Sequence, residues 1–108
     1  MISVTVEIDD KDIVRQYSVK GHGGFDKKGK DIVCSAVSVL SLASYMTMRD
    51  VVKEGMEVSD GVDFFYKVDD YESEKRDLLK GISLFLLNGL IETHKKYRKY
   101  IDLKIVRS

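Results

Sequence analysis

The chain has 108 residues, 44% of them hydrophobic, and its 18 basic and 18 acidic residues give a formal net charge of zero. This length predicts a single domain over residues 1–108, and the balanced charge disfavours a dedicated nucleic-acid binder, which is usually basic. No apolar run approaches the roughly 20 residues that cross a bilayer and no secretory signal opens the chain, so we expect a cytoplasmic protein without a membrane partner.

The first half of the sequence predicts two strands, a loop and a helix. Residues 2–8 alternate apolar and polar side chains, as does the run 13–19, and the acidic turn between them indicates an antiparallel hairpin. Residues 20–30 carry four glycines and predict a surface loop. From Asp31 apolar residues recur at helical spacing, which predicts an amphipathic helix to about Met48 with Asp31 as its N-cap.

The second half predicts a hairpin, a helix and a last strand. Asp60–Gly61 lies between two alternating runs within residues 56–68, which is typical of a hairpin turn. Residues 71–97 predict a helix with Ser73 as N-cap and with a buried stripe formed by Leu78, Leu79, Ile82, Phe85, Leu86 and Leu90. Residues 100–106 predict a strand. The expected fold is therefore α+β, in the order ββαββαβ, with a mostly antiparallel sheet, two helices packed on one face, and exposed edges that favour self-association.

The segment "GHGGFDKKGKDIVCSAVS", residues 21–38, holds His22 and the chain's only cysteine, Cys34. A nucleophilic cysteine acts as the thiolate, which the first turn of a helix stabilises, and Asp31 as N-cap would make Cys34 the third helical residue. His22 would then take the thiol proton and later donate it to a leaving amine. The alternative is that Cys34 is a small buried hydrophobe without a chemical role.

Other residues of the segment also have two interpretations. Asp31 either caps the helix or orients the imidazole of His22, the role of the third residue in a catalytic triad. Gly21 and Gly23 would let the main chain of a substrate approach closely. Ser38 lies one turn after the cysteine, where it either contacts substrate or bonds to the backbone of its own helix.

This segment closely resembles the signature of the ribosomal-processing cysteine proteases, the Prp family. The family pattern is Gly–His, a variable loop containing glycine, then Asp-Ile-Val-Cys followed by small residues and a serine. His22 matches the family's catalytic histidine and Cys34 its nucleophile, while Asp31 and Ser38 occupy other signature positions. Ser35 stands where alanine is usual, which conserves small volume. The resemblance in length and element order spans nearly the whole chain.

The resemblance implies a cysteine endopeptidase that removes the N-terminal extension of a bacterial large-subunit ribosomal protein. Substrates of the family end this extension in a hydrophobic stretch with paired phenylalanines near the cut, which implies an apolar groove beside Cys34. It also implies a homodimer.

Two other classes of function remain as alternatives. The run "HKKYRKY", residues 94–100, interleaves basic residues with tyrosines and would suit a non-catalytic module that associates with the ribosome or RNA. The balanced charge elsewhere disfavours this nucleic-acid partner. One cysteine and two histidines, without CxxC or HExxH spacing, are too few ligands for a zinc site, so we expect neither a metal nor another cofactor.

Overall fold

The computed structural model describes the backbone of residues 1–21, 28–61 and 63–108; side chains are described over the same ranges except for residues 28–31. These residues form five strands, two α-helices and a short 3-10 helix. Their bounds are β1 (Ile2–Ile8), β2 (Val14–Lys20), α1 (Lys28–Val52), β3 (Met56–Asp60), β4 (Phe64–Val68), η1 (Ser73–Lys75), α2 (Arg76–Lys96) and β5 (Ile101–Arg107).

The strands form one sheet in the order β3-β4-β2-β1-β5. β1 is antiparallel to β2, β2 to β4 and β4 to β3, whereas β5 runs parallel to β1. The predicted α+β class, the order ββαββαβ and the mostly antiparallel sheet are therefore confirmed. The strict alternation of β1 explains its bounds, because Ile2, Val4, Val6 and Ile8 are all buried while the residues between them are half-buried.

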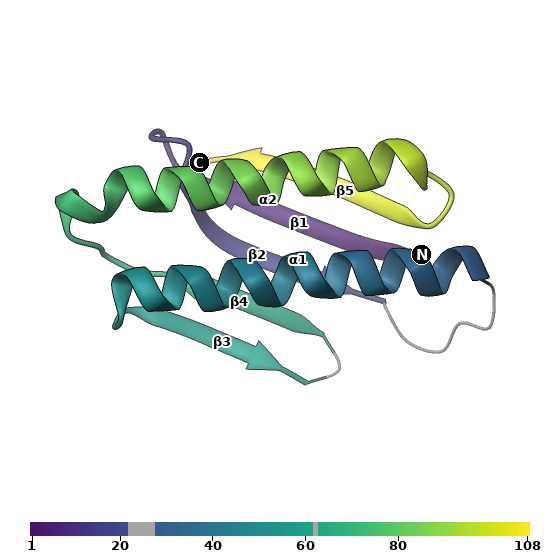
Figure 1. Cartoon of the computed structure of the whole chain (residues 1–108), viewed down its shortest axis with the longest axis horizontal. Coiled ribbons are helices and arrows are strands. Elements are labelled where there is room, and N and C mark those ends of the chain that lie inside the picture. The colour runs from purple at the N-terminus through teal and green to yellow at the C-terminus, as the bar shows by residue number, and fades with distance from the viewer. Residues whose placement is uncertain (22–27, 62) are drawn as a thin grey trace.

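Both helices lie side by side on one face of the sheet and run in opposite directions (Figure 1). They approach closely at Gly89 of α2, where a β-carbon would lie 2.7 Å from a methyl group of Leu40 on α1. The core lies between this helical layer and the sheet. Its fully buried members include Tyr17 and Tyr66 from the strands, Val33 and Met48 from α1 and, from α2, Leu79, Leu86 and Leu90.

The first helix is longer than its sequence predicts. α1 begins at Lys28 and ends at Val52, so it starts three residues before Asp31 and extends four beyond Met48. The prediction of Asp31 as N-cap is therefore wrong, since this residue lies in the first turn. An N-cap residue precedes the first helical residue and does not lie within the helix. A side chain that is able to cap, such as that of Asp31, does not by itself determine where the helix begins.

The second helix differs from its prediction in its start and in its buried face. Ser73 begins η1, and α2 begins at Arg76, where Lys75 occupies the N-cap position and makes no side-chain cap. Ser83 is buried in α2, whereas Leu78 is 59% exposed and Phe85 is 74% exposed. The Ser83 hydroxyl accepts the N–H of Val14 at 2.9 Å, so a hydrogen bond to the sheet places this serine in the core.

One described segment, Ile32–Val52 of α1, is long and apolar enough to cross a membrane by length and composition alone. The serines and the threonine within it shorten each apolar run, which explains why the sequence shows no long run of apolar residues. Val33, Val37 and Met48 of the same segment are buried in the domain. Core helices meet the same criterion, so this segment is weak evidence for a membrane span.

Candidate active site

Cys34 lies in the second turn of α1, at the border of the core. Because α1 begins at Lys28, Cys34 is its seventh residue and not the third, as predicted. An amide at this position of a regular helix donates to the carbonyl four residues earlier, and the influence of the helix dipole falls off within the first turn. The thiol is half-buried and packs against the core residues. The helix start therefore stabilises a Cys34 thiolate less than the sequence suggested.

A pocket of about 90 Å³ opens beside Cys34. Four strands and α1 contribute to its lining, which consists of Ile2, Val19, Cys34, Val37, Ser38, Ser41, Leu42, Asp60 and Phe64. Most of these side chains are apolar, and the polar groups are the thiol, two hydroxyls and one carboxylate. A mostly apolar pocket with a few polar groups is typical of a site that binds an apolar group and orients it.

Several lining residues were missed by the sequence analysis. Asp60 was identified only as a turn residue, and nothing in its local sequence shows that the β3–β4 hairpin reaches the pocket. Ser41 was also missed, although a serine within an apolar helical stripe is a detectable signal. Its hydroxyl is 3% exposed and bonds to Tyr17 and to the carbonyl of Val37.

Ser38 shares the pocket with Cys34, as their spacing of one helical turn predicts. The hydroxyls of Ser41 and Thr47 donate to helix carbonyls four residues earlier. Among the residues that the structure describes, Ser38 makes no bond of this kind and is exposed. The two interpretations of Ser38, as a substrate contact and as a residue bonded to the backbone of its own helix, stay predictions.

Gly21 directly follows β2 and has a backbone conformation that requires glycine. Its φ is +76°, and a β-carbon here would lie 2.7 Å from the carbonyl oxygen of Met1. Val19, two residues earlier, lines the Cys34 pocket. The glycine thus has a structural role at the point where the chain leaves the sheet beside the pocket, whether or not it contacts substrate.

We expect Gly21→Ala to lower the free energy of unfolding by about 1–2 kcal/mol or more, because a left-handed conformation disfavours a side chain and the Met1 carbonyl must also shift. Gly61→Ala is the matched control, since a β-carbon at Gly61 would have no neighbouring atom within 4 Å. Thermal unfolding of both variants measures the difference. Equal unfolding temperatures for the two variants would contradict this role of Gly21.

The remaining predicted site residues are only partly described. His22 and Gly23 lie outside the described residues, as does the side chain of Asp31. The structure therefore brings together Cys34 and Ser38 in one pocket, with the end of β2 forming part of its wall. The roles of His22 as base, Asp31 as orienting residue and Gly23 as substrate contact stay predictions.

The basic run at residues 94–100 spans the last turn of α2 and the turn before β5. Tyr97 and Tyr100 are half-buried and pack against the core. Their amides are also bonded, from Tyr97 to the Thr93 carbonyl and from Tyr100 to the Tyr97 carbonyl. Base stacking on single-stranded nucleic acid needs exposed aromatic faces, so this arrangement weakens the RNA-binding alternative.

Within the described ranges, no group of three or more His, Cys, Asp or Glu side chains is positioned to hold a metal ion.

Comparison with known proteins relates the chain to one family. A model of the family described as cysteine protease Prp matches residues 1–102. Among solved structures, the chain is similar to SMU.848 from Streptococcus mutans, with a TM-score of 0.82, 21% identity, and coverage of 100% of this chain and 96% of that chain. A search among curated proteins found no match.

The chain is also similar to the essential ribosomal processing protease Prp from S. aureus. The complex of that protease with a substrate peptide gives a TM-score of 0.78, 21% identity, and coverage of 97% of this chain and 99% of that chain. Its complex with a covalently linked product peptide gives a TM-score of 0.75 and 24% identity at the same coverage. At these identities the structures establish a shared fold, and the family model establishes descent.

Proposed function

The chain belongs to the cysteine protease Prp family, and on that premise we propose that it is an endopeptidase that removes the N-terminal extension of a bacterial large-subunit ribosomal protein. The observation that carries this proposal is the position of Cys34 in the wall of a mostly apolar pocket. The relatives from S. aureus, described with a substrate peptide and with a covalently linked product peptide, support a peptide as the ligand. The same proposal places the protein in the cytoplasm, a reducing compartment that would keep the thiol reduced.

In the proposed reaction His22 takes the proton of the Cys34 thiol, and the sulfur attacks the scissile carbonyl carbon. The C–N bond then breaks, the leaving amine takes the proton from the imidazolium, and the acyl group remains on sulfur as a thioester. Water, deprotonated by the imidazole, attacks the thioester and releases the acid and the thiolate. No cofactor takes part in these steps.

Chain connectivity supports the pairing of His22 with Cys34. Val19 lines the same pocket as Cys34, and three residues of extended chain span at most about 11 Å. An imidazole on such a short connection can reach the pocket, so the spacing in sequence fits the proposed proton transfer.

The oxyanion of the tetrahedral intermediate needs hydrogen-bond donors other than the Cys34 amide. That amide lies in the second turn of α1, where a regular helix uses it internally. The unpaired N–H groups of the first turn and those of the glycine-containing segment before Lys28 are the remaining candidates.

The proposed substrate matches the pocket in polarity. Val37, Leu42 and Phe64 would pack against an apolar side chain of the extension, while Asp60 and Ser38 add polar groups to the lining. The experiment is incubation of the full chain with a peptide that spans the extension and the mature N-terminus, followed by mass spectrometry of the fragments. We expect one cut at the junction, and a scrambled peptide of the same composition should remain intact. An intact junction peptide after prolonged incubation would overturn the proposal.

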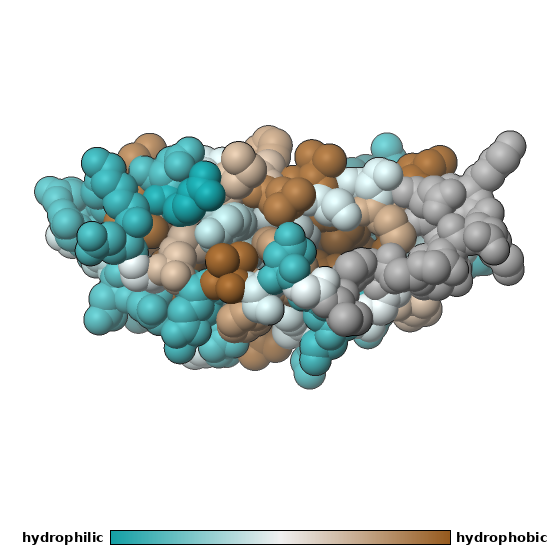
Figure 2. All heavy atoms as spheres, turned by 90° about the horizontal axis from the view of Figure 1, so that it is seen from below, coloured by the Kyte–Doolittle hydropathy of each residue, from teal (hydrophilic) through white to brown (hydrophobic). Residues whose placement is uncertain are grey.

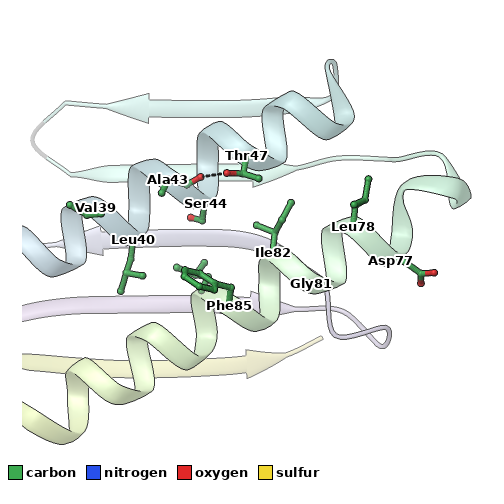
Figure 3. A pocket seen from close by; sticks show the side chains of 11 residues that line it. Val39, Leu40, Ala43, Ser44, Thr47, Asp77, Leu78, Gly81, Ile82 and Phe85 are labelled. Carbon is green, nitrogen blue, oxygen red and sulfur yellow. Dashed lines mark hydrogen bonds between the residues drawn. The ribbon is translucent and has the colours of Figure 1, made fainter.

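We further propose that the chain forms a homodimer through the outer face of the helical layer. An apolar groove of about 460 Å³ runs between α1 and α2, and Figure 3 shows Leu78, Ile82 and Phe85 of α2 pointing toward α1 there. Leu78, Phe85 and Val39 are between 59% and 74% exposed, which is typical of an interaction surface. A second copy would bury these side chains.

The sheet edges are weaker candidates for this interface than the sequence suggested. Seen from the side of β3, hydrophilic residues cover much of the surface and hydrophobic ones are scattered among them (Figure 2). Glu57 and Asp60 are exposed on β3, and Lys104 and Arg107 are exposed on β5. Charged side chains on edge strands oppose edge-to-edge pairing.

We expect Phe85→Glu to convert the dimer to a monomer, because the substitution introduces a charge into the lining of the apolar groove. Leu84→Glu is the matched control, since Leu84 is likewise exposed, at 59%, but does not line the groove. Light scattering coupled to size-exclusion chromatography measures the mass of each variant. A dimer that survives Phe85→Glu would rule out this interface.

A further inference from the structure

Two buried tyrosine–serine pairs connect α1 to the sheet. The Tyr17 and Ser41 hydroxyl oxygens lie 2.5 Å apart, and those of Tyr66 and Ser44 lie 2.9 Å apart. Both tyrosines have no exposed surface, and the serines are only 3% and 6% exposed. Each pair thus joins the helix to a strand beneath it, one to β2 and the other to β4.

The direction of these hydrogen bonds follows from the single proton of a serine hydroxyl. Ser41 donates that proton to the carbonyl of Val37 at 2.6 Å, and Ser44 donates to the carbonyl of Ser41 at 3.0 Å. Both tyrosines must therefore be the donors. Burial raises the pKa of Tyr17 to about 12, although the bond with Ser41 acts in the opposite direction, so the phenol stays protonated at neutral pH.

The two tyrosine–serine pairs lie next to different cavities. Ser41 lines the pocket of Cys34, as does Val37, whose carbonyl accepts the Ser41 proton. Ser41 also follows Cys34 by seven residues, which is about two helical turns on the same face. Ser44 lines the groove between the helices instead and has no part in this pocket.

We propose that the Tyr17–Ser41 hydrogen bond is a positioning contact for the Cys34 site, which fixes where the N-terminal half of α1 rests on β2. A hydroxyl pair requires one distance and direction, so it specifies one placement of the helix, whereas apolar contacts tolerate small shifts. Misplacement of a reacting group by 1 Å can lower a rate by about 10²-fold. The effect on cleavage rests on the proposed function, while the effect on the Cys34 thiol does not.

The test compares Tyr17→Phe with Tyr66→Phe, because each change removes one buried donor hydroxyl from one of the two pairs. We expect Tyr17→Phe to lower kcat for peptide cleavage by about 10-fold or more with little change in KM, since the sulfur moves and most of the substrate-binding surface does not. Tyr66→Phe should change kcat by less than about twofold. The rate at which iodoacetamide alkylates Cys34, measured against pH, should also shift only in Tyr17→Phe.

The unfolding temperatures of the variants distinguish a positioning role of the Tyr17–Ser41 bond from a merely structural one. Both variants should lower the unfolding temperature to a similar extent, since each removes a buried hydrogen bond. Ser41→Ala should match Tyr17→Phe in kcat, and the double variant should be no worse than either single one. If Tyr17→Phe does not fold, Ser41→Ala against Tyr66→Phe gives the same contrast.

Equal kcat values and superimposable alkylation profiles for the variants of the two pairs would overturn the positioning role. A wild-type chain that cleaves no junction peptide would instead overturn the proposed function. In that case the alkylation profile of Cys34 still decides whether Tyr17 positions the thiol.

Discussion

Cys34→Ala is expected to abolish cleavage of the junction peptide, with a loss of at least about 10³-fold in kcat/KM, because the variant has no atom that can form the thioester. The fold should persist. Cys34 is half-buried at the border of the core, so removal of its sulfur should cost less than about 2 kcal/mol in the free energy of unfolding. Peptide cleavage followed by mass spectrometry and thermal unfolding measure the two effects.

Ser35→Ala is the matched control for this substitution. Ser35 is the neighbour of Cys34 on α1, is exposed, and does not line the pocket. The control should cleave the peptide at the wild-type rate. Retained turnover in Cys34→Ala would exclude this residue as the nucleophile.

His22→Ala is expected to lower kcat by about 10²–10⁴-fold, which is the usual contribution of a general base and acid. The remaining thiol would have to lose its proton to solvent, so activity in the variant should rise with pH toward the ordinary cysteine pKa of about 8.5. Steady-state kinetics across the pH range measures both the loss and the changed profile.

His94→Ala is the control for a general effect of histidine loss, because His94 is the other histidine of the chain and lies in the last turn of α2. Its pH profile should match that of the wild type. An unchanged rate in His22→Ala would remove this residue from the mechanism.

β1 was predictable because its side chains alternate strictly between buried and half-buried positions, and β2 alternates in part. The bounds of β1 match the predicted range 2–8, and β2 is shifted by one residue from 13–19. The pairing of β5 with β1 was beyond the sequence pattern, since alternation indicates which face a residue occupies and not which strand lies beside it. That pairing is the one parallel contact in the sheet that the described strands form.

The helices show where periodicity alone misleads. The apolar face of α2, formed by leucines, an isoleucine and a phenylalanine, is wider than the part of the helix that packs against the sheet. Leu78 and Phe85, which belong to this face, therefore remain exposed. Ser83 takes a core position because its hydroxyl is fully bonded, donating to the Leu79 carbonyl and accepting from Val14. Hydrogen bonds between distant elements decide such positions, and a local pattern contains no information about them.

The candidate site was predictable to a similar degree. The sequence of residues 21–38 predicts Cys34 as the nucleophile, but only the structure shows the pocket beside it. The contributions of Asp60 and Phe64 depend on how the β3–β4 hairpin docks beside α1, which no local pattern encodes. The predicted third helical position of Cys34 failed because the helix begins before Asp31.

One titration examines the whole mechanism: the alkylation rate of residue 34 as a function of pH, in the wild type and in the variant that lacks the imidazole at residue 22. A reactive ion pair predicts a midpoint well below 8.5 in the wild type and a return toward that value in the variant. A thiol that resists the reagent at every pH until the protein unfolds would instead identify a packing residue, and the protease mechanism would be wrong.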